Sequence, residues 1–283
     1  MNDAPISPPR AAALPGTELA PATLNGWFVL HQLFRVDWSL VRSMDPAERR
    51  APLSELLALL DGWSGDSTRG WSAVYRMVGG GVDLMFLHFR PTLDDLTTAS
   101  HQVALSGLSD VLVPDHEYVS VVELGMYPLT ASVADRVPPS DNAAYSAALE
   151  EALAGERDKA FVRRRIYPVQ PDDMPYVSYY PMDKRRDRGQ NWYALPLDTR
   201  ASLMKAHGTI GRRYAGRITQ VISGSVGFAD WEWAVTLWAA DPLVFKEIVT
   251  EMRYDEASAV YGEFGRFFVG RRMTAEDISA LWP

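Results

Sequence analysis

The feature of this sequence that most constrains its fold is one order of predicted elements that occurs twice. Alternating apolar residues predict strands, and apolar residues at helical spacing predict helices, in the order strand, helix, strand, strand, helix, strand. In the first half these segments are 27–37, 45–60, 70–77, 82–89, 92–108 and 117–127. In the second half they are 176–182, 198–214, 217–223, 231–238, 242–254 and 264–271. The repetition indicates a structural duplication.

Each repeat has the element order of a ferredoxin-like unit, in which helices cover one face of an antiparallel sheet. We therefore predict an α+β fold with two ferredoxin-like units in one chain, of the dimeric α/β barrel type, with antiparallel sheets and helices outside. The predicted division is a disordered N-terminal arm (1–23), an N-terminal ferredoxin-like domain (24–129), a linker with a short helix (130–175) and a C-terminal ferredoxin-like domain (176–283).

Composition excludes several classes of function. The net charge of −8 disfavours binding to nucleic acid or to an anionic membrane surface. The absence of cysteine excludes disulfides, thiolate catalysis, iron–sulfur clusters and cysteine-ligated haem. No run of about 18 apolar residues predicts a membrane span, and the Ala- and Pro-rich arm has no signal-peptide pattern. The expected location is the cytoplasm.

One predicted strand has a mixed face that suggests a ligand. Alternation from residue 176 places Tyr176, Ser178, Tyr180 and Met182 on one side, with Lys184 in phase after them. Phenols, a thioether and an ammonium together are unusual for a core face and for a solvent face. A half-buried structural tyrosine is the alternative interpretation of Tyr180.

His207 lies on the apolar stripe of the next predicted helix, for which Asp198 is the candidate N-cap. One interpretation is a core histidine hydrogen-bonded to a carbonyl group. The other is a ligand to haem-type iron, for which a single axial imidazole suffices, since no second histidine or cysteine lies nearby to complete a zinc site. A tyrosine and cations on the preceding strand would suit a porphyrin and its propionates.

Four runs of residues carry a resemblance to a known family. They are YPMDKRR, NWYxL, RxxLMKAHGxxGRxYAG and the long run from ITQVISGSVGFADWEWAV to EASAxYGEFGxFFVG. Together they resemble the chlorite dismutase-like family, specifically its coproheme decarboxylase branch. The likeness covers essentially the whole second half and, more loosely, the first.

The resemblance implies a reaction in which the substrate is also the redox cofactor. Members of this branch use hydrogen peroxide to convert two propionates of iron coproporphyrin III (coproheme) to vinyl groups, which gives haem b. By resemblance His207 is the axial ligand of the iron, and Tyr180 is the residue oxidised to a radical. Met182 and Lys184 follow in the same motif, and the lysine lies close to a reacting propionate.

Gln220 is the residue that best separates the activities within the family. It shares a predicted strand face with Ile218 and Ile222, so we expect a polar group in an apolar wall that needs a partner. Chlorite dismutases resemble this chain but place an arginine there, above the iron, where it helps to hold oxyanions. Glutamine fits one group of coproheme decarboxylases.

Five further residues are predicted contacts of the porphyrin by resemblance. Arg253 and Ser258 match positions that hydrogen-bond propionates, although a helix-surface cation and a helix cap are the alternatives. Tyr127 and Arg165 resemble propionate contacts of the first half and the linker, and the basic run that contains Arg165 also suits a solvated linker. Trp233 is a candidate wall of the porphyrin, with core packing as the alternative.

The resemblance also implies that the C-terminal domain binds haem and that the N-terminal domain has lost its haem site. We therefore expect the first-half histidines to be structural or surface residues, namely His31, His88, His101 and His116. A homo-oligomer, by family a pentamer, and a coproporphyrin ferrochelatase are the expected partners. The alternative functions are a haem-dependent chlorite dismutase, a haem-binding protein without turnover and a dye-type peroxidase.

Overall fold

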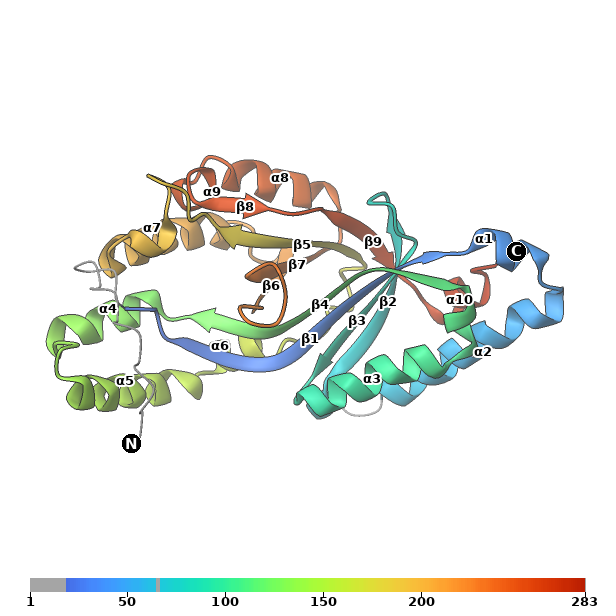
Figure 1. The fold of residues 1–283 in the computed structure, drawn as a ribbon, viewed down its shortest axis with the longest axis horizontal. Coiled ribbons are helices and arrows are strands. Elements are labelled where there is room, and N and C mark those ends of the chain that lie inside the picture. Colours follow the sequence, from blue (N-terminus) through green and yellow to red (C-terminus); the bar gives the residue numbers. More distant parts are fainter. Residues whose placement is uncertain (1–18, 65–66, 283) are drawn as a thin grey trace, which may run out of the picture.

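The computed structural model describes residues 19–64 and 67–282 (Figure 1). The first half contains β1 (Thr23–Val36), α1 (Trp38–Ser43), α2 (Pro46–Trp63), β2 (Trp71–Val78), β3 (Leu84–Arg90), α3 (Leu93–Leu105) and β4 (Leu112–Gly125). The middle contains α4 (Tyr127–Arg136), α5 (Asn142–Arg157) and α6 (Ala160–Ile166). The second half contains β5 (Tyr176–Lys184), α7 (Leu197–Arg212), β6 (Ile218–Gly224), β7 (Trp233–Ala239), α8 (Leu243–Met252), α9 (Glu256–Ala259), β8 (Gly262–Phe264), β9 (Phe268–Arg272) and α10 (Ala275–Ser279).

The strands form two ferredoxin-like arrangements that join edge to edge. The spatial order is β4-β1-β3-β2 in the first half and β9-β5-β7-β6 in the second, and the named strands pair antiparallel. Pairing of β2 with β9 and of β4 with β6 connects the two units, so the eight strands close into a barrel, while β8 adds to β5. The predicted α+β class, with paired ferredoxin-like units and outer helices, is confirmed. Closure leaves the two units with no free edge at their junctions.

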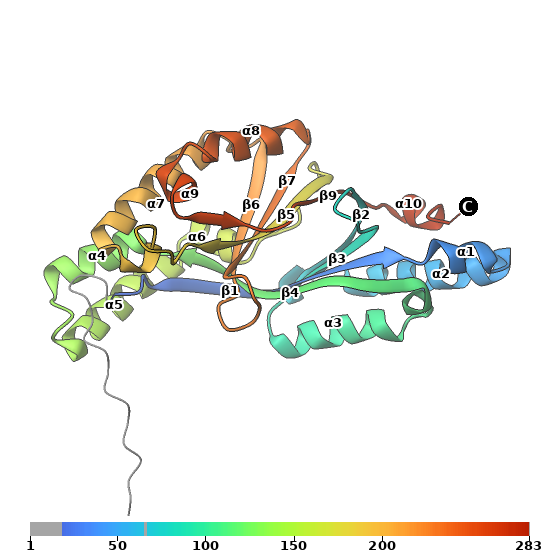
Figure 2. The same cartoon turned by 45° about the horizontal axis from the view of Figure 1, so that its top comes forward.

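The barrel interior is packed with side chains. Large apolar and aromatic residues from both halves fill it, among them Trp27, Leu33, Tyr75, Phe89, Tyr118, Tyr179, Trp238 and Phe268. Figure 2 shows α7 and α8 on one side of the strands, over the second half, and α2 and α3 on the other side, under the first half. Each group of helices covers a separate apolar cluster on the outer face of its own sheet. The interior is therefore a core, and a site for a ligand has to lie outside it.

Some element boundaries differ from the expected ones. The strand predicted for 117–127 ends at Gly125, and Tyr127 begins α4, because Pro128 suits the first turn of a helix. The strand predicted for 264–271 is divided into β8 and β9. Helix α7 begins at Leu197 after Pro196, so Asp198 lies in its first turn and the predicted N-cap is wrong.

The linker range 130–175 holds most of α4 together with α5 and α6, whereas a single short helix was expected. The four-part division of the chain stays a prediction. Residues 1–18 of the predicted arm lie outside the described residues. Within the described ranges, no helix has the length and apolar character needed to cross a membrane.

Helix α6 docks against β1 at a place where only glycine fits. A Cβ atom built on Gly26 would lie 1.8 Å from the carbonyl oxygen of Ile166. We expect Gly26→Ala to lower the free energy of unfolding by about 1–3 kcal/mol, because either α6 or β1 must shift. The matched control is Gly62→Ala in α2, where the added methyl meets nothing within 4 Å. Urea denaturation of both variants checks this, and equal midpoints would contradict it.

Candidate functional site

The outer face of the second sheet, beneath α7 and α8, carries the residues singled out on β5, β6 and β7. Strand register aligns them in rows that run across the three strands. The rows are Met182, Trp233 and Gly224; Tyr180, Val235 and Ile222; and Ser178, Leu237 and Gln220. The mixed face predicted for β5 therefore continues across two further strands. We call these three rows the outer face of the second half.

His207 projects from α7 with its imidazole held by a carboxylate. Its Nδ1 lies 2.7 Å from Oδ2 of Asp255, which precedes α9, and the histidine side chain is 28% exposed. The same carboxylate oxygen accepts hydrogen bonds from the backbone N–H and the hydroxyl of Ser258, each at 3.2 Å. An imidazole whose Nδ1–H donates to a carboxylate has its Nε2 lone pair free to bind a metal. Asp255 was not among the predicted residues.

Tyr180 is almost fully buried among aromatic rings. Its ring stacks on Phe267 at 4.2 Å between centroids and lies 6.0 Å from the ring of Phe264. Burial raises the pKa of the Tyr180 phenol well above its usual value, and the nearby Arg253 guanidinium only partly opposes this. The phenol is therefore protonated at neutral pH, and it can lose its proton readily only together with an electron.

Lys184 is buried, and its ammonium contacts the α9 turn. The Nζ atom donates to the Ala257 carbonyl at 2.6 Å and lies 4.3 Å from the centroid of the Trp192 ring. Burial lowers the pKa of Lys184 to about 8, although the nearby Asp255 and Glu232 act in the opposite direction. The side chain is thus a cation that can lose its charge close to physiological pH.

Arg253 and Ser258 lie at the corner between α8 and α9. Arg253 follows the last residue of α8, and its guanidinium lies 4.1 Å from the Phe264 centroid. Ser258 is buried in α9 and bonded to Asp255, which itself caps that helix. The corner therefore supplies both the carboxylate that holds His207 and a cation whose field reaches Tyr180.

The remaining outer-face residues differ in environment. Met182 is half-buried and pairs with Trp233 and Phe264. The Trp233 indole N–H donates to Glu123 Oε1 at 2.8 Å, and burial raises the pKa of that carboxyl. Gln220 is exposed, whereas Ile218 and Ile222 on the same strand face are half-buried in the apolar cluster. The partner expected for its amide stays a prediction.

The two predicted contacts from outside the second half are placed differently. Tyr127 packs edge-on to Trp192, at 6.2 Å between ring centroids. The Lys184 ammonium lies over the same Trp192 ring. Arg165 lies in the last turn of α6 and is exposed, and the described residues offer it no hydrogen bond or ion pair. The structure therefore brings Tyr127 toward the site and does not join Arg165 to it.

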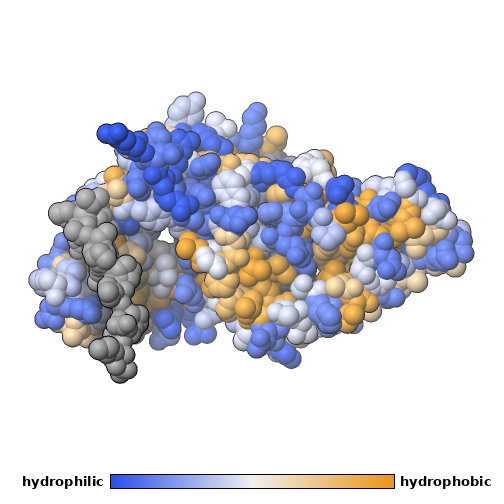
Figure 3. Space-filling model, in the orientation of Figure 1, coloured by the Kyte–Doolittle hydropathy of each residue, from blue (hydrophilic) through white to orange (hydrophobic). Residues whose placement is uncertain are grey.

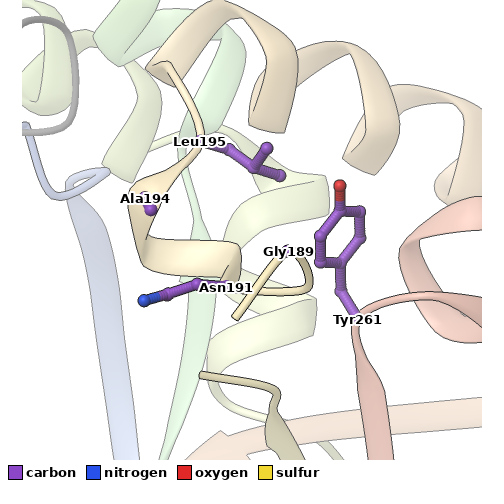
Figure 4. Close-up of a pocket in the computed structure, with 5 residues that line it drawn as sticks. All are labelled: Gly189, Asn191, Ala194, Leu195 and Tyr261. Atoms are coloured by element: carbon purple, nitrogen blue, oxygen red, sulfur yellow. The ribbon is translucent and has the colours of Figure 1, made fainter. Parts of the chain in front are cut away.

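A small pocket that the sequence did not predict lies beside Trp192. It has a volume of about 180 Å³ and is lined by Gly189, Asn191, Ala194, Leu195 and Tyr261. Leu195 points toward the Tyr261 ring in Figure 4. Ligand pockets usually have volumes of about 300–1,000 Å³, and none of the redox-active or metal-binding candidates lines this one. The NWYxL run that forms part of its wall was the only sequence signal for it.

Comparison with known proteins identifies the group to which this architecture belongs. Residues 49–273 match the family model described as chlorite dismutase. The chain belongs to the chlorite dismutase family. Relatives with this fold carry different names, among them coproheme decarboxylase and chlorite dismutase.

Among the relatives, a coproheme decarboxylase of Staphylococcus saprophyticus is 41% identical over 270 residues, which cover 93% of this chain and 98% of that protein. A solved haem-binding protein from Thermus thermophilus is 39% identical, with a TM-score of 0.79 over 93% of this chain and 97% of the other. A chlorite dismutase variant from Candidatus Nitrospira defluvii is 19% identical, with a TM-score of 0.68 over 90% and 95%. At 19% identity, the match to the chlorite dismutase variant supports a shared fold and nothing more.

Proposed function

We propose that this protein is a coproheme decarboxylase, an enzyme that uses hydrogen peroxide to convert two propionates of iron coproporphyrin III to vinyl groups. The observation that carries the proposal is the combination of His207, held by Asp255, with the buried phenol of Tyr180 and the cations around it. The 41% identical coproheme decarboxylase, aligned over nearly its whole length, supports the same activity.

The residues fit an iron porphyrin. His207 would hold the iron through its Nε2 atom, because its Nδ1 atom is engaged with Asp255. Met182 and Ile222, which are only partly buried, would supply apolar surface for the macrocycle. Lys184 and Arg253 supply positive charge for carboxylates, which accept short, charge-assisted hydrogen bonds.

The chemistry divides between the substrate and the protein. When bound, the iron porphyrin reacts with hydrogen peroxide and supplies the two oxidising equivalents that each decarboxylation needs. For each propionate, the group itself, one peroxide and one proton give a vinyl group, carbon dioxide and two waters. Tyr180 gives up its electron and proton and then recovers both as a hydrogen atom from the propionate side chain. Lys184 holds the carboxylate, and Asp255 holds the proton on Nδ1 of His207.

The deciding experiment is to load the purified protein with iron coproporphyrin III, titrate in hydrogen peroxide and follow the porphyrin mass and the Soret band. Stepwise loss of two carboxyl groups that ends at haem b is the expected result. Bleaching or inert binding without a mass change would overturn the proposal. Chlorite turnover, measured in parallel as oxygen release, tests the alternative activity.

We further propose that the enzyme is a cytoplasmic homopentamer that receives coproheme from a coproporphyrin ferrochelatase. The family resemblance supports both partners. Figure 3 shows apolar side chains gathered near the middle of the visible face, and exposed apolar patches mark interaction surfaces. Light scattering coupled to gel filtration tests the assembly, and a monomer would contradict it.

The affinity for coproheme should fall as the pH rises through about 8, because Lys184 loses the charge that attracts a propionate. Hydrogen bonds to charged groups contribute about 1.5–3 kcal/mol, so the expected weakening is roughly 10- to 100-fold. Spectroscopic titration of coproheme at several pH values measures this. Lys184→Gln should bind weakly across the whole range, and an identical pH profile in that variant would contradict the role of Lys184.

A further inference from the structure

Tyr179 precedes Tyr180 on β5 and projects into the barrel interior, whereas Tyr180 lies on the outer face. The Tyr179 hydroxyl has a hydrogen-bond partner that can accept a proton. Tyr179 is fully buried, and its hydroxyl lies 3.0 Å from Nε2 of His116 on β4. Burial raises the pKa of Tyr179 well above its usual value, so the phenolate is strongly disfavoured. Oxidation of this phenol therefore requires that its proton move to a neighbouring base in the same step.

His116 suits the role of that base. Burial, together with the charge of Arg266, lowers the pKa of His116, while Asp115 and Glu117 act against the shift. The imidazole is thus neutral at physiological pH, and its Nε2 can accept the Tyr179 hydroxyl proton. His116 is also only partly buried, so a proton that it accepts can exchange with solvent.

Aromatic rings surround both Tyr179 and Tyr180. The His31 ring stacks on Tyr179 at 4.1 Å with a 14° angle, and burial lowers the pKa of His31 to about 3, which keeps that neighbour uncharged. Phe268 stacks on Tyr179, and the adjacent Phe267 stacks on Tyr180. The Cα atoms of the consecutive tyrosines are about 3.8 Å apart, and the two phenols project from opposite faces of the strand, so an electron that passes between them crosses the backbone of β5.

We propose that Tyr179 is a second redox-active tyrosine, which takes over the oxidising equivalent from Tyr180 when no propionate is available to supply a hydrogen atom. The proposal rests on the radical role of Tyr180 in the proposed function. An electron passes from Tyr179 to the oxidised Tyr180, and the Tyr179 hydroxyl proton moves to Nε2 of His116. Tyr180 recovers its proton from solvent, and the protonated His116 releases one to solvent. The net change is a neutral radical on Tyr179 and a restored phenol at Tyr180.

Tyr118 shows what Tyr179 would lack without His116. Its ring lies 6.2 Å from that of Tyr179, and it too is buried. Its hydroxyl, however, donates to the backbone carbonyl of Trp231 at 2.8 Å, and a carbonyl group cannot accept a proton at neutral pH. Tyr118 is therefore the matched control, since it is buried beside Tyr179 and its hydroxyl donates to a group that cannot act as a base.

The transfer would move an oxidising equivalent, which could otherwise damage the porphyrin, away from the macrocycle. Once both propionates have reacted, or before one is in position, Tyr180 has no hydrogen atom to abstract. A radical held inside a packed barrel is separated from the macrocycle, and a small one-electron reductant such as ascorbate can later return it to the phenol. Tyr179 would thus protect the porphyrin from oxidation, and the first decarboxylation would not depend on Tyr179.

The first test uses the protein loaded with haem b, which has no propionate left to convert, and electron paramagnetic resonance after freeze-quenching with peroxide. A tyrosyl signal that is lost in Tyr179→Phe and in His116→Gln, and kept in Tyr118→Phe, is the expected result. Glutamine can accept the hydrogen bond of Tyr179 but cannot take its proton. Tyr179→Phe should also bleach faster per peroxide added. An unchanged signal in Tyr179→Phe would overturn the proposal.

The second test needs no porphyrin, so it separates this proposal from the proposed function. Photogenerated tris(bipyridine)ruthenium(III) is added to the purified chain, and the tyrosyl absorption is followed after the flash. The long-lived radical should disappear in Tyr179→Phe and persist in Tyr118→Phe. A long-lived radical in Tyr179→Phe would show that Tyr179 is not the sink. Failure of haem b formation, with this result intact, would count against the decarboxylase alone.

Discussion

Replacement of Tyr180 by phenylalanine is expected to abolish formation of haem b while coproheme still binds. The substitution removes one oxygen and keeps the ring that stacks on Phe267. Binding should persist because the imidazole of His207, the apolar wall and the cations do not depend on the phenol. The chemistry should stop because no other hydroxyl on the outer face of the second half combines burial with a nearby propionate-binding cation. Porphyrin mass after peroxide addition measures the loss.

Tyr176→Phe is the matched control for this experiment. Tyr176 lies on the same face of the same strand, two positions before Ser178, and it packs against the same apolar cluster. It should decarboxylate coproheme at the wild-type rate. Normal yields of haem b from Tyr180→Phe would remove the radical role from this residue, and equal losses in both variants would point to a packing defect.

The sequence predicted each ferredoxin-like unit but not how the two units join. Apolar periodicity shows which face of a strand is buried, and the repeated element order implies the strand order within a unit. The pairings of β2 with β9 and of β4 with β6 depend on edge strands meeting across more than 100 residues. Secondary-structure propensity carries no information about which distant edge strands pair. The strand predicted to reach Tyr127 ends early for a local reason, because Pro128 suits the first turn of a helix.

The site was predictable where it follows a local pattern. His207 on its helical stripe and Tyr180 on its alternating face could be identified from spacing together with the family motifs. Asp255 could not, because it is 48 residues from His207 and its local signal is that of a helix cap. The same limit applies to His116 and Tyr179, which lie in different halves and meet only when the barrel closes. Contacts between distant elements thus account for what the sequence did not predict.

Replacement of His207 by alanine is expected to remove the iron ligand and to shift the Soret band of the coproheme complex. The affinity for coproheme should also fall, because the bond to iron is lost and only the contacts of the apolar wall and the cations with the porphyrin remain. Asp255→Asn provides a graded comparison, because it keeps the shape of the side chain and weakens its hold on Nδ1. Partners of metal-bound histidines usually contribute about 10- to 100-fold to metal affinity, so this variant should lie between wild type and His207→Ala.

The control for both variants is His101→Ala, which removes an exposed histidine from α3 in the half without a predicted haem site. Its Soret band and affinity should match those of the wild type. An unchanged spectrum for His207→Ala would mean that another group ligates the iron. If Asp255→Asn left the spectrum and the affinity unaltered while His207→Ala changed both, the carboxylate would serve only to cap α9. The intermediate result is expected because Asp255 has both roles, at one oxygen atom shared by Ser258 and His207.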